Sequence, residues 1–256
     1  MSEPQDFAGK TAVITGAGSG MGRETVLLLA RQGCRVIAVD RNLAGARETA
    51  ASAQALGATA DAYEVDVTHS ADVTRTIREI IAKHGPIDAA ASLAGAYDVR
   101  PVEAIDDANW AFMMGTNFYG MANLCSAVLL GMIERRSGAI VNMSSIHALR
   151  GQTSAAAYAA AKSAVIGYTR SIAREKGPLG IRANAVAPGP INTPLWRAGR
   201  VGDVLARDMI ERAKVIPLGR LGEPAEVAQM IVFLLGPRSS YITGQVFNID
   251  GGEVMS

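Results

Sequence analysis

Several kinds of residue are scarce in this chain of 256 residues, and each scarcity excludes a class of protein. Aromatic side chains make up only 5% of the chain, and its two cysteines, Cys34 and Cys125, lie in apolar stretches without the spacing of metal ligands. We therefore expect two reduced thiols in the core, no disulfide and no metal site. The 25 lysines and arginines nearly balance the 24 aspartates and glutamates, so the charge does not favour a nucleic-acid partner.

The chain also lacks a long hydrophobic run. The longest uniformly apolar stretch, residues 230–235, is far shorter than the roughly 20 residues that span a bilayer. The first six residues have neither the basic region nor the apolar core of a signal peptide. We therefore expect a protein of the reducing cytoplasm, without a membrane partner.

What the chain does have is a regular alternation of strand-like and helix-like segments. Apolar runs predict strands at 11–15, 35–40, 60–65, 87–92, 139–144, 181–186 and 246–249. The stretches between them predict helices at 21–31, 43–56, 70–84, 107–135 and 155–176, and one that opens at Glu223-Pro224. We expect Ser70 to be the N-cap of its helix.

This alternation indicates an α/β fold with a parallel sheet of about seven strands and helices on both faces. No linker, repeat or low-complexity segment interrupts it. We therefore expect a single domain over residues 1–256.

A glycine-rich turn follows the first predicted strand. Residues 15–22 read Thr-Gly-Ala-Gly-Ser-Gly-Met-Gly, and the glycines allow a sharp turn and a close approach of the backbone to a ligand. The next helix offers free N–H groups and a partial positive charge to a pyrophosphate. A strand before this cluster and a helix after it predict a dinucleotide site that includes Gly16, Ser19, Gly20 and Met21.

The second predicted strand ends at Asp40, 18 residues after the last of these glycines. A carboxylate at this spacing accepts hydrogen bonds from the adenosine ribose and repels a 2′-phosphate, which favours NAD over NADP. Arg41 is the opposing signal, because an arginine there can pair with that phosphate. We favour NAD, since the carboxylate acts whichever way Arg41 turns. Asp66 and Val67 are placed to reach the adenine, although a turn or helix cap explains Asp66 equally well.

Tyr158 and Lys162 are the strongest indication of catalysis. Four residues apart on a predicted helix, they lie on one face, one turn from each other. An ammonium that close favours the phenolate, so we expect Lys162 to lower the pKa of Tyr158 from its usual value of about 10. Such a tyrosine can exchange a proton with a hydroxyl or carbonyl. Ser145 stands 13 residues before it, and we expect Ser145 rather than Ser144 to face the site, because neighbours on a strand point to opposite faces.

These motifs, in this order, resemble those of the short-chain dehydrogenase/reductase family in its single-domain form. The resemblance covers almost the whole chain and also rests on Asn117, on Pro188-Gly189 with Thr193, and on the closing Asp-Gly-Gly. It implies a Rossmann-type doubly wound sheet. It also implies hydride transfer that interconverts a ketone with a secondary alcohol, or with a ring or sugar hydroxyl.

The resemblance implies a role for each of these positions. Tyr158 would be the general acid/base, Lys162 would tune it and hold the nicotinamide ribose, and Ser145 would hold the substrate oxygen. Asn117 would order a water between Lys162 and solvent. Further cofactor contacts would come from two stretches that follow strands, namely Leu93, Ala94, Gly95, Pro188, Gly189, Ile191 and Thr193.

One stretch departs from the family pattern, which often has Asn-Asn-Ala-Gly after the fourth strand. This chain has Ser92-Leu93 before Ala94 and Gly95. Ser92 replaces only part of the missing amide hydrogen bonding, so we expect a site that is less rigid or binds its cofactor less tightly.

Substrate contacts are expected from two segments. His147 and Gln152 follow Ser145 and either contact the substrate or only shape their loop. In the family, the region at about 193–217 is a substrate lid, and its Leu195 and Trp196 suit a mobile cover over an apolar substrate. Arg197 and Arg200 of this region could grip an anionic group, although surface arginines commonly have no such role.

The helices at 107–135 and 155–176 are apolar around much of their circumference. One face covers the sheet, and the remaining surface needs a partner. In the family these helices pair with their copies, so we predict a homotetramer, with a dimer as the alternative.

Two other functions remain open. An NADPH-dependent 3-oxoacyl-[acyl-carrier-protein] reductase shares most of these motifs, and Asp40 argues against it. A dinucleotide-binding protein without catalysis has no need of a tuned acid/base, so the presence of Ser145, Tyr158 and Lys162 argues against that.

Overall fold

The computed structural model describes residues 5–198 and 202–255. Its centre is a seven-stranded sheet in the order β3-β2-β1-β4-β5-β6-β7, in which every neighbouring pair is parallel. The strands are β1 Thr11–Thr15, β2 Arg35–Asp40, β3 Ala60–Glu64, β4 Ala89–Ser92, β5 Gly138–Met143, β6 Ile181–Pro188 and β7 Val246–Ile249. The predicted Rossmann-type doubly wound sheet is confirmed.

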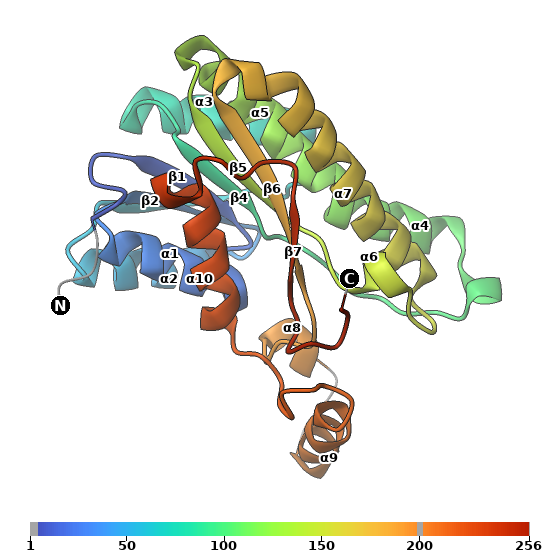
Figure 1. Ribbon diagram of the computed structural model, residues 1–256. Coiled ribbons are helices and arrows are strands. Elements are labelled where there is room, and N and C mark those ends of the chain that lie inside the picture. Colours follow the sequence, from blue (N-terminus) through green and yellow to red (C-terminus); the bar gives the residue numbers. More distant parts are fainter. Residues whose placement is uncertain (1–4, 199–201, 256) are drawn as a thin grey trace.

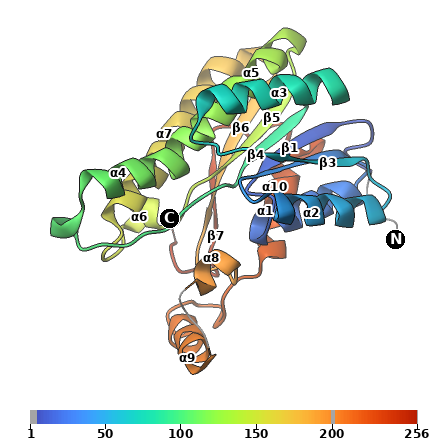
Figure 2. The ribbon, with the colours of Figure 1, turned by 180° about the vertical axis from the view of Figure 1, so that it is seen from behind.

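Helices cover both faces of the sheet (Figures 1 and 2). One core contains residues of α1 Gly20–Arg31, α2 Leu43–Ala55 and α10 Pro224–Leu235. The other contains residues of α3 Ser70–His84, α5 Gly120–Arg135 and α7 Ala156–Lys176. Successive strand residues enter opposite cores, as Val13 and Ile14 of β1 do, which explains why the buried strands are apolar throughout.

The strand order reverses between β1 and β4, which pair with Thr15 opposite Ser92. The connections from these two strands leave in opposite directions, so a crevice opens at their carboxyl ends. The glycine-rich turn after β1 and the Leu93-Ala94-Gly95 stretch after β4 both lie at this crevice.

The predicted helix at 107–135 is a run of three pieces rather than a uniform helix. It consists of α4 Asp107–Met114, a π-helical turn Gly115–Tyr119 and α5 Gly120–Arg135. Asn117 lies in the widened turn, a feature that often marks functional sites. By length and composition this run could cross a membrane, but α5 packs on the sheet as a core helix through buried residues such as Leu124 and Val128.

The predicted N-cap at Ser70 is wrong. Ser70 is the first residue of α3, and the N-cap position belongs to His69, whose side chain makes no capping hydrogen bond. The preceding turn is closed instead by Asp66, whose Oδ1 accepts from the amide and the hydroxyl of Thr68 at 2.9 and 2.7 Å. The helix therefore starts one residue earlier than its serine suggests.

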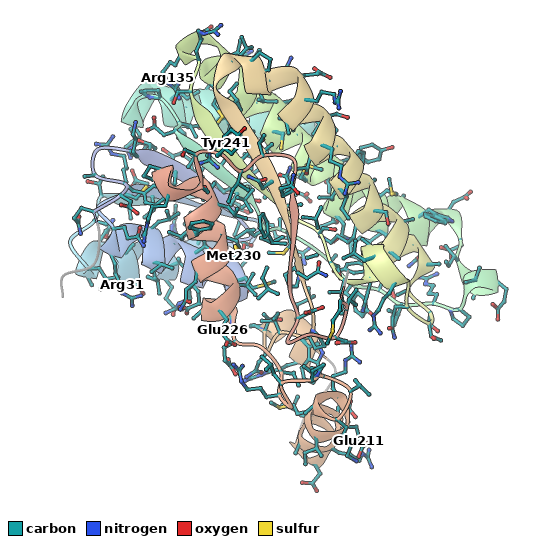
Figure 3. The ribbon with its side chains drawn as sticks, viewed as in Figure 1. Arg31, Arg135, Glu211, Glu226, Met230 and Tyr241 are labelled. Carbon is teal, nitrogen blue, oxygen red and sulfur yellow. The ribbon has the colours of Figure 1, made fainter. Side chains whose placement is uncertain are left out.

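Two further helices lie in the expected lid region, α8 Pro194–Arg197 and α9 Gly202–Ala213. They extend beyond the end of the sheet in Figure 1, and Glu211, labelled in Figure 3, lies on α9. The C-terminal end of the chain lies beside α6 His147–Arg150 in both ribbon views.

Candidate active site

The turn after β1 requires glycine at two positions. Gly16 has a φ of +68°, and a Cβ there would lie 2.7 Å from the amide nitrogen of Ala94. A Cβ on Gly22 would lie 2.1 Å from the carbonyl oxygen of Gly16. The turn can thus lie against the start of α1 and the stretch after β4 only without side chains. That cradle and the helix start form the geometry that a pyrophosphate occupies.

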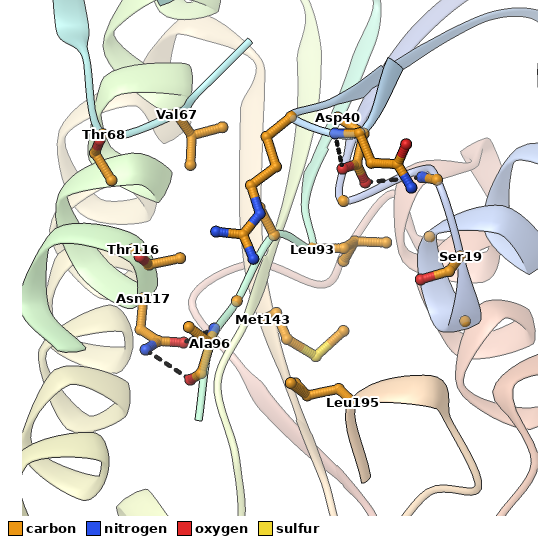
Figure 4. A pocket seen from close by; sticks show the side chains of 18 of the residues that line it. Ser19, Asp40, Val67, Thr68, Leu93, Ala96, Thr116, Asn117, Met143 and Leu195 are labelled. Atoms are coloured by element: carbon orange, nitrogen blue, oxygen red, sulfur yellow. Dashed lines mark hydrogen bonds between the residues drawn. The ribbon is translucent and has the colours of Figure 1, made fainter. Parts of the chain in front are cut away.

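Asp40 is held in place at the edge of this cradle. Its Oδ2 accepts from the amide of Gly18 at 2.9 Å, and its Oδ1 accepts from the amide of Asn42 at 2.8 Å (Figure 4). The carboxylate is therefore oriented by the glycine turn itself. Arg41 lies near Asp66: the pKa of Asp66 is held below its usual value mainly by Thr68, with a smaller effect of Arg41.

A cavity of about 610 Å³ runs from this cradle to the middle of the sheet edge. Most of the predicted cofactor residues line it: Gly16, Ser19, Gly20, Met21, Asp40, Arg41, Asp66, Val67, Leu93, Ala94, Gly95, Tyr158, Lys162 and Thr193. The sequence interpretation missed other lining residues, among them Asn42, Thr68, Ala96, Phe112, Thr116 and Met143. Their side chains follow no recognisable spacing, so no sequence signal marked them.

The Ser92 side chain makes no hydrogen bond to the described residues. Its hydroxyl is buried, and the stretch after β4 is tied to β1 instead. The amides of Leu93 and Ala94 donate to the Thr15 hydroxyl at 3.2 and 3.5 Å. Thr15 thus joins the two strands at the point where their order reverses.

Tyr158 and Lys162 lie on one face of α7 at the end of the cavity. The Lys162 Nζ lies 5.7 Å from the centroid of the Tyr158 ring and donates to the carbonyl of Met143 at 2.9 Å. Ser145 is hydrogen-bonded to Tyr158. Ser144 points the other way, and its hydroxyl donates to the Lys162 carbonyl at 2.9 Å. The two hydroxyls therefore have different partners, as expected for neighbours at the end of a strand.

The expected lowering of the tyrosine pKa is wrong for this arrangement. Burial raises the pKa of Tyr158 to about 12, helped slightly by Tyr97 and opposed by the hydrogen bond with Ser145. Burial also lowers the pKa of Lys162 to about 7. The same enclosure that brings the two groups together disfavours the charged form of each, and the spacing argument neglected this desolvation.

Asn117 is held by the stretch after β4 and by helix α4. Its side-chain amide donates to the carbonyls of Ala96 at 3.0 Å and Met113 at 3.1 Å, and its oxygen accepts from the Ala96 amide at 3.2 Å (Figure 4). A Cβ on Gly95 would lie 3.1 Å from that oxygen and 3.8 Å from the Lys162 Nζ. The widened helical turn therefore places Asn117 close to Lys162.

A second cavity of about 500 Å³ meets the first at Tyr158. Ser145, His147, Gln152, Leu195 and Trp196, the predicted substrate residues, all line it together with Tyr158. Pro188, Gly189 and Ile191, which were expected to contact the cofactor, also line this second cavity rather than the first. Both cavities share a wall made of Met21, Met143, Tyr158, Thr193 and Leu195.

An aromatic cluster encloses the Tyr158 phenol on the side of the second cavity. The Tyr97 ring lies edge-on to Tyr158 with centroids 4.9 Å apart, and the His147 ring lies edge-on to it at 5.7 Å. The His147 amide donates to the Ser145 hydroxyl oxygen at 3.2 Å. Burial, with Arg150 and Arg212 nearby, lowers the pKa of His147 to about 4, so the imidazole is neutral at physiological pH.

Arg197 and Arg200 were considered above as residues that could bind an anionic group of the substrate. The Arg197 Nε donates to the side-chain oxygen of Asn192 at 2.7 Å, which ties it to its own loop. Arg200 lies outside the described residues.

Comparisons with known proteins agree with this geometry. A family model described as enoyl-(acyl carrier protein) reductase matches residues 16–253. The 3-oxoacyl-[acyl-carrier-protein] reductase FabG of Thermotoga maritima is 38% identical over 247 residues, covering 96% of this chain and 98% of its own. The 2-keto-3-deoxy-L-fuconate dehydrogenase of Xanthomonas campestris pv. campestris is 38% identical over 253 residues, covering 95% and 80%.

The solved structure of levodione reductase superposes with a TM-score of 0.93 at 32% identity, covering 96% of this chain and 98% of that one. The folds therefore agree along almost the whole length, as do the sequences of the two relatives above. The chain belongs to the short-chain dehydrogenase/reductase family of oxidoreductases.

Proposed function

We propose that this protein is an NAD(H)-dependent oxidoreductase that interconverts a secondary alcohol, or a ring or sugar hydroxyl, with the corresponding ketone. The observation that carries this proposed reaction is that the two cavities meet at Tyr158. Ligands in the two cavities meet at the wall that the cavities share, and Tyr158 is the titratable residue of that wall. We place the enzyme in the cytoplasm.

The cradle suits a dinucleotide, because Gly16 and Gly22 let the turn pack against the backbone around it, where a Cβ would collide, and the turn lines the cavity with its own backbone. A bound nicotinamide dinucleotide supplies hydride chemistry. The glycine turn and the start of α1 would hold its pyrophosphate, and Asp40 its adenosine ribose. Lys162 and Thr193 line the other end of the cavity, where the nicotinamide ribose and carboxamide would lie.

In this arrangement the protein itself handles one proton. Ser145 orients the substrate oxygen, and Tyr158 gives its phenolic proton to that oxygen during reduction or takes it during oxidation. Tyr97 and His147 enclose the phenol and limit the access of water. Because Lys162 has a pKa of about 7, its ammonium can exchange protons near neutral pH and can favour the phenolate when charged.

The preference for NAD(H) rests on Asp40. Its carboxylate is fixed by the amide of Gly18 in the cradle and the amide of Asn42 after β2, and it lines the cofactor cavity. A 2′-phosphate placed there would meet a negative charge that cannot turn away. Arg41 lines the same cavity, and its charge slightly lowers the pKa of Asp66.

The second candidate is an NADPH-dependent 3-oxoacyl-[acyl-carrier-protein] reductase. Proteins of that name are among the relatives that match this chain over nearly its full length. Arg41 lines the cofactor cavity and offers a cation to a 2′-phosphate.

Initial rates with NADH and NADPH test the proposal across a panel of ketones that includes cyclic diketones, keto sugars and 3-oxoacyl thioesters. We expect NADH to give the higher kcat/KM, and the change Asp40→Ala to move the NADH/NADPH ratio at least tenfold toward NADPH. Asp72→Asn, which removes an exposed carboxylate on α3, is the matched control. A wild-type preference for NADPH together with thioester substrates would favour the second candidate.

A further inference from the structure

Glu253, three residues from the C-terminus, ties the catalytic loop to the lid. Its side chain is 4% exposed, and its Oε1 accepts from the Arg150 Nη2 at 2.6 Å and from the Arg212 Nη2. Arg150 ends α6, the short helix that follows the Ser145 loop, and Arg212 lies on α9. Three segments that are far apart in sequence thus meet at one buried carboxylate.

The position of Glu253 is fixed by the turn that precedes it. The Asp250 carboxylate accepts from the amide of Gly252 at 3.0 Å and from the amide of Val254 at 2.8 Å. These bonds hold the backbone on both sides of Glu253. The ion-pair triad is therefore a built arrangement rather than a contact of a loose chain end.

The charges that line the substrate cavity are unfavourable for an anion. Arg212 is the one lysine or arginine among the lining residues that the structure describes, and its guanidinium is paired with Glu253. Asp208 and Glu211 add two carboxylates to the same lining, and Glu211 is itself paired with Lys214 at 2.6 Å. A carboxylate that enters loses its hydration without gaining a free cation.

The triad lies close enough to the reaction to matter. The Arg150 and Arg212 charges both contribute to the lowered pKa of His147, whose ring lies edge-on to Tyr158 at 5.7 Å. A substrate bound to Ser145 and Tyr158 therefore shares the electrostatic surroundings of these two guanidiniums. The pairing of Arg150 and Arg212 with Glu253 therefore affects the electrostatic potential around the part of the substrate that does not react.

We propose that Glu253 is a specificity-determining residue that keeps Arg212 and Arg150 engaged, so that the cavity takes neutral ketones and alcohols and discriminates against their carboxylate-bearing analogues. This inference rests on the proposed oxidoreductase function and names its substrate class. The carboxylate-bearing analogues bind less well because the cavity offers no unpaired cation to their negative charge; a protein gains specificity when it leaves a competing ligand unpaired in this way.

A matched pair of ketones tests this in the full-length enzyme. Methyl 3-oxobutanoate and 3-oxobutanoate have the same reacting carbonyl and differ chiefly in charge. We expect the ester/acid ratio of kcat/KM to exceed about tenfold in the wild type and to fall about tenfold in Glu253→Gln, with Glu253→Asp intermediate, if one released cation is worth a typical charged hydrogen bond. Glu48→Gln, which removes one carboxylate from the exposed pair with Arg23, should leave the ratio unchanged.

The double variant Glu253→Gln/Arg212→Gln separates charge from mere loosening of the lid. It should move the ratio back toward the wild-type value, because the released guanidinium that lines the cavity is gone, whereas a loosened lid would stay loose. An unchanged ratio in a folded Glu253→Gln protein, or a wild type that prefers the acid, would overturn the inference. The ester/acid ratio of kcat/KM in the wild type is measured without any variant, so it tests the inference even if Glu253→Gln does not fold. Failure of both ketones and of the wider panel would instead reject the proposed function.

Discussion

At the scale of single residues, burial controls the charge of the candidate catalytic groups. Lys162 is 2% exposed, and its pKa of about 7 lies well below the usual 10.5. Between pH 7 and pH 10.5, Lys162 is protonated in the unfolded chain and largely neutral in the folded chain. The contribution of Lys162 to the free energy of unfolding therefore rises with pH across this window, by at most about 1.4 kcal/mol per pH unit.

We expect this slope to appear as a difference between two proteins. The free energy of unfolding of the wild type, minus that of Lys162→Met, should become more favourable to the wild type from pH 7 to pH 9 in urea titrations. Higher pH is unsuitable, because buried Tyr158, Cys34 and Cys125 have raised pKa values and lower the stability there. A pH-independent difference would show that Lys162 keeps its proton in the folded state.

Tyr158→Phe tests the proton transfer itself. The ring packing against Tyr97 and His147 should survive, so the fold and dinucleotide binding should persist while kcat falls at least about 100-fold. Turnover and NADH binding by fluorescence titration, measured on the same sample, separate these effects. A variant that keeps most of its turnover would exclude Tyr158 as the acid/base.

Helix periodicity placed Tyr158 and Lys162 on one face, and the family resemblance, through its spacing, added Ser145 to them. The sequence could not place Tyr97, Arg212 or Glu253, which reach the substrate cavity or its edge from three unrelated loops and helices. It also missed the direction of the tyrosine pKa shift, since desolvation depends on the enclosure that only the folded chain creates.

At the scale of elements, boundaries that depend on apolar periodicity were predicted well, and those that depend on tertiary contacts were not. β1, β2 and β7 match their predicted bounds. The π-helical turn was missed because its cause is the bonding of Asn117 to Ala96 and Met113. Helix α9 was missed because its segment was assigned as a whole to the substrate lid and not examined as an element; none of its described residues is buried.

Arg182 connects β6 with the end of α10, a contact that the sequence pattern does not predict. From β6, its guanidinium donates to the carbonyl oxygens of Leu234 at 2.8 Å and Gly236 at 2.9 Å and to the hydroxyl of Ser239 at 2.9 Å. It thereby satisfies the carbonyl end of α10, where a cation is also favoured by the helix dipole.

We expect Arg182→Lys to lower the free energy of unfolding by about 2 kcal/mol, because an ammonium cannot reproduce the planar set of donors. Urea denaturation measures this loss, and kcat per folded molecule should stay the same. Arg238→Lys, in an exposed pair with Asp6, should cost much less. Equal losses of unfolding free energy in Arg182→Lys and Arg238→Lys would show that the bonds from Arg182 to the end of α10 add no special stability.

At the scale of the whole molecule, apolar side chains remain exposed on the helices predicted to pair with a copy. Tyr119 is 56% exposed and Leu130 is 64% exposed, and Tyr241 before β7 is fully exposed. We predict a homotetramer with about four times the chain mass of 26.7 kDa in light scattering after size exclusion. Leu130→Glu should reduce the mass, whereas Leu56→Glu, at the exposed leucine that follows α2, should not. A wild-type monomer would refute the assembly.

The shared wall between the two cavities has a thermodynamic consequence. Met21, Thr193 and Leu195 border both spaces, so a molecule bound in one of them sets part of the shape of the other. The two ligands are then coupled, and the coupling is reciprocal: the factor by which the dinucleotide changes the affinity for the ketone equals the factor by which the ketone changes the affinity for the dinucleotide. A lid residue such as Leu195 can thereby alter the retention of a cofactor whose chemistry it never touches.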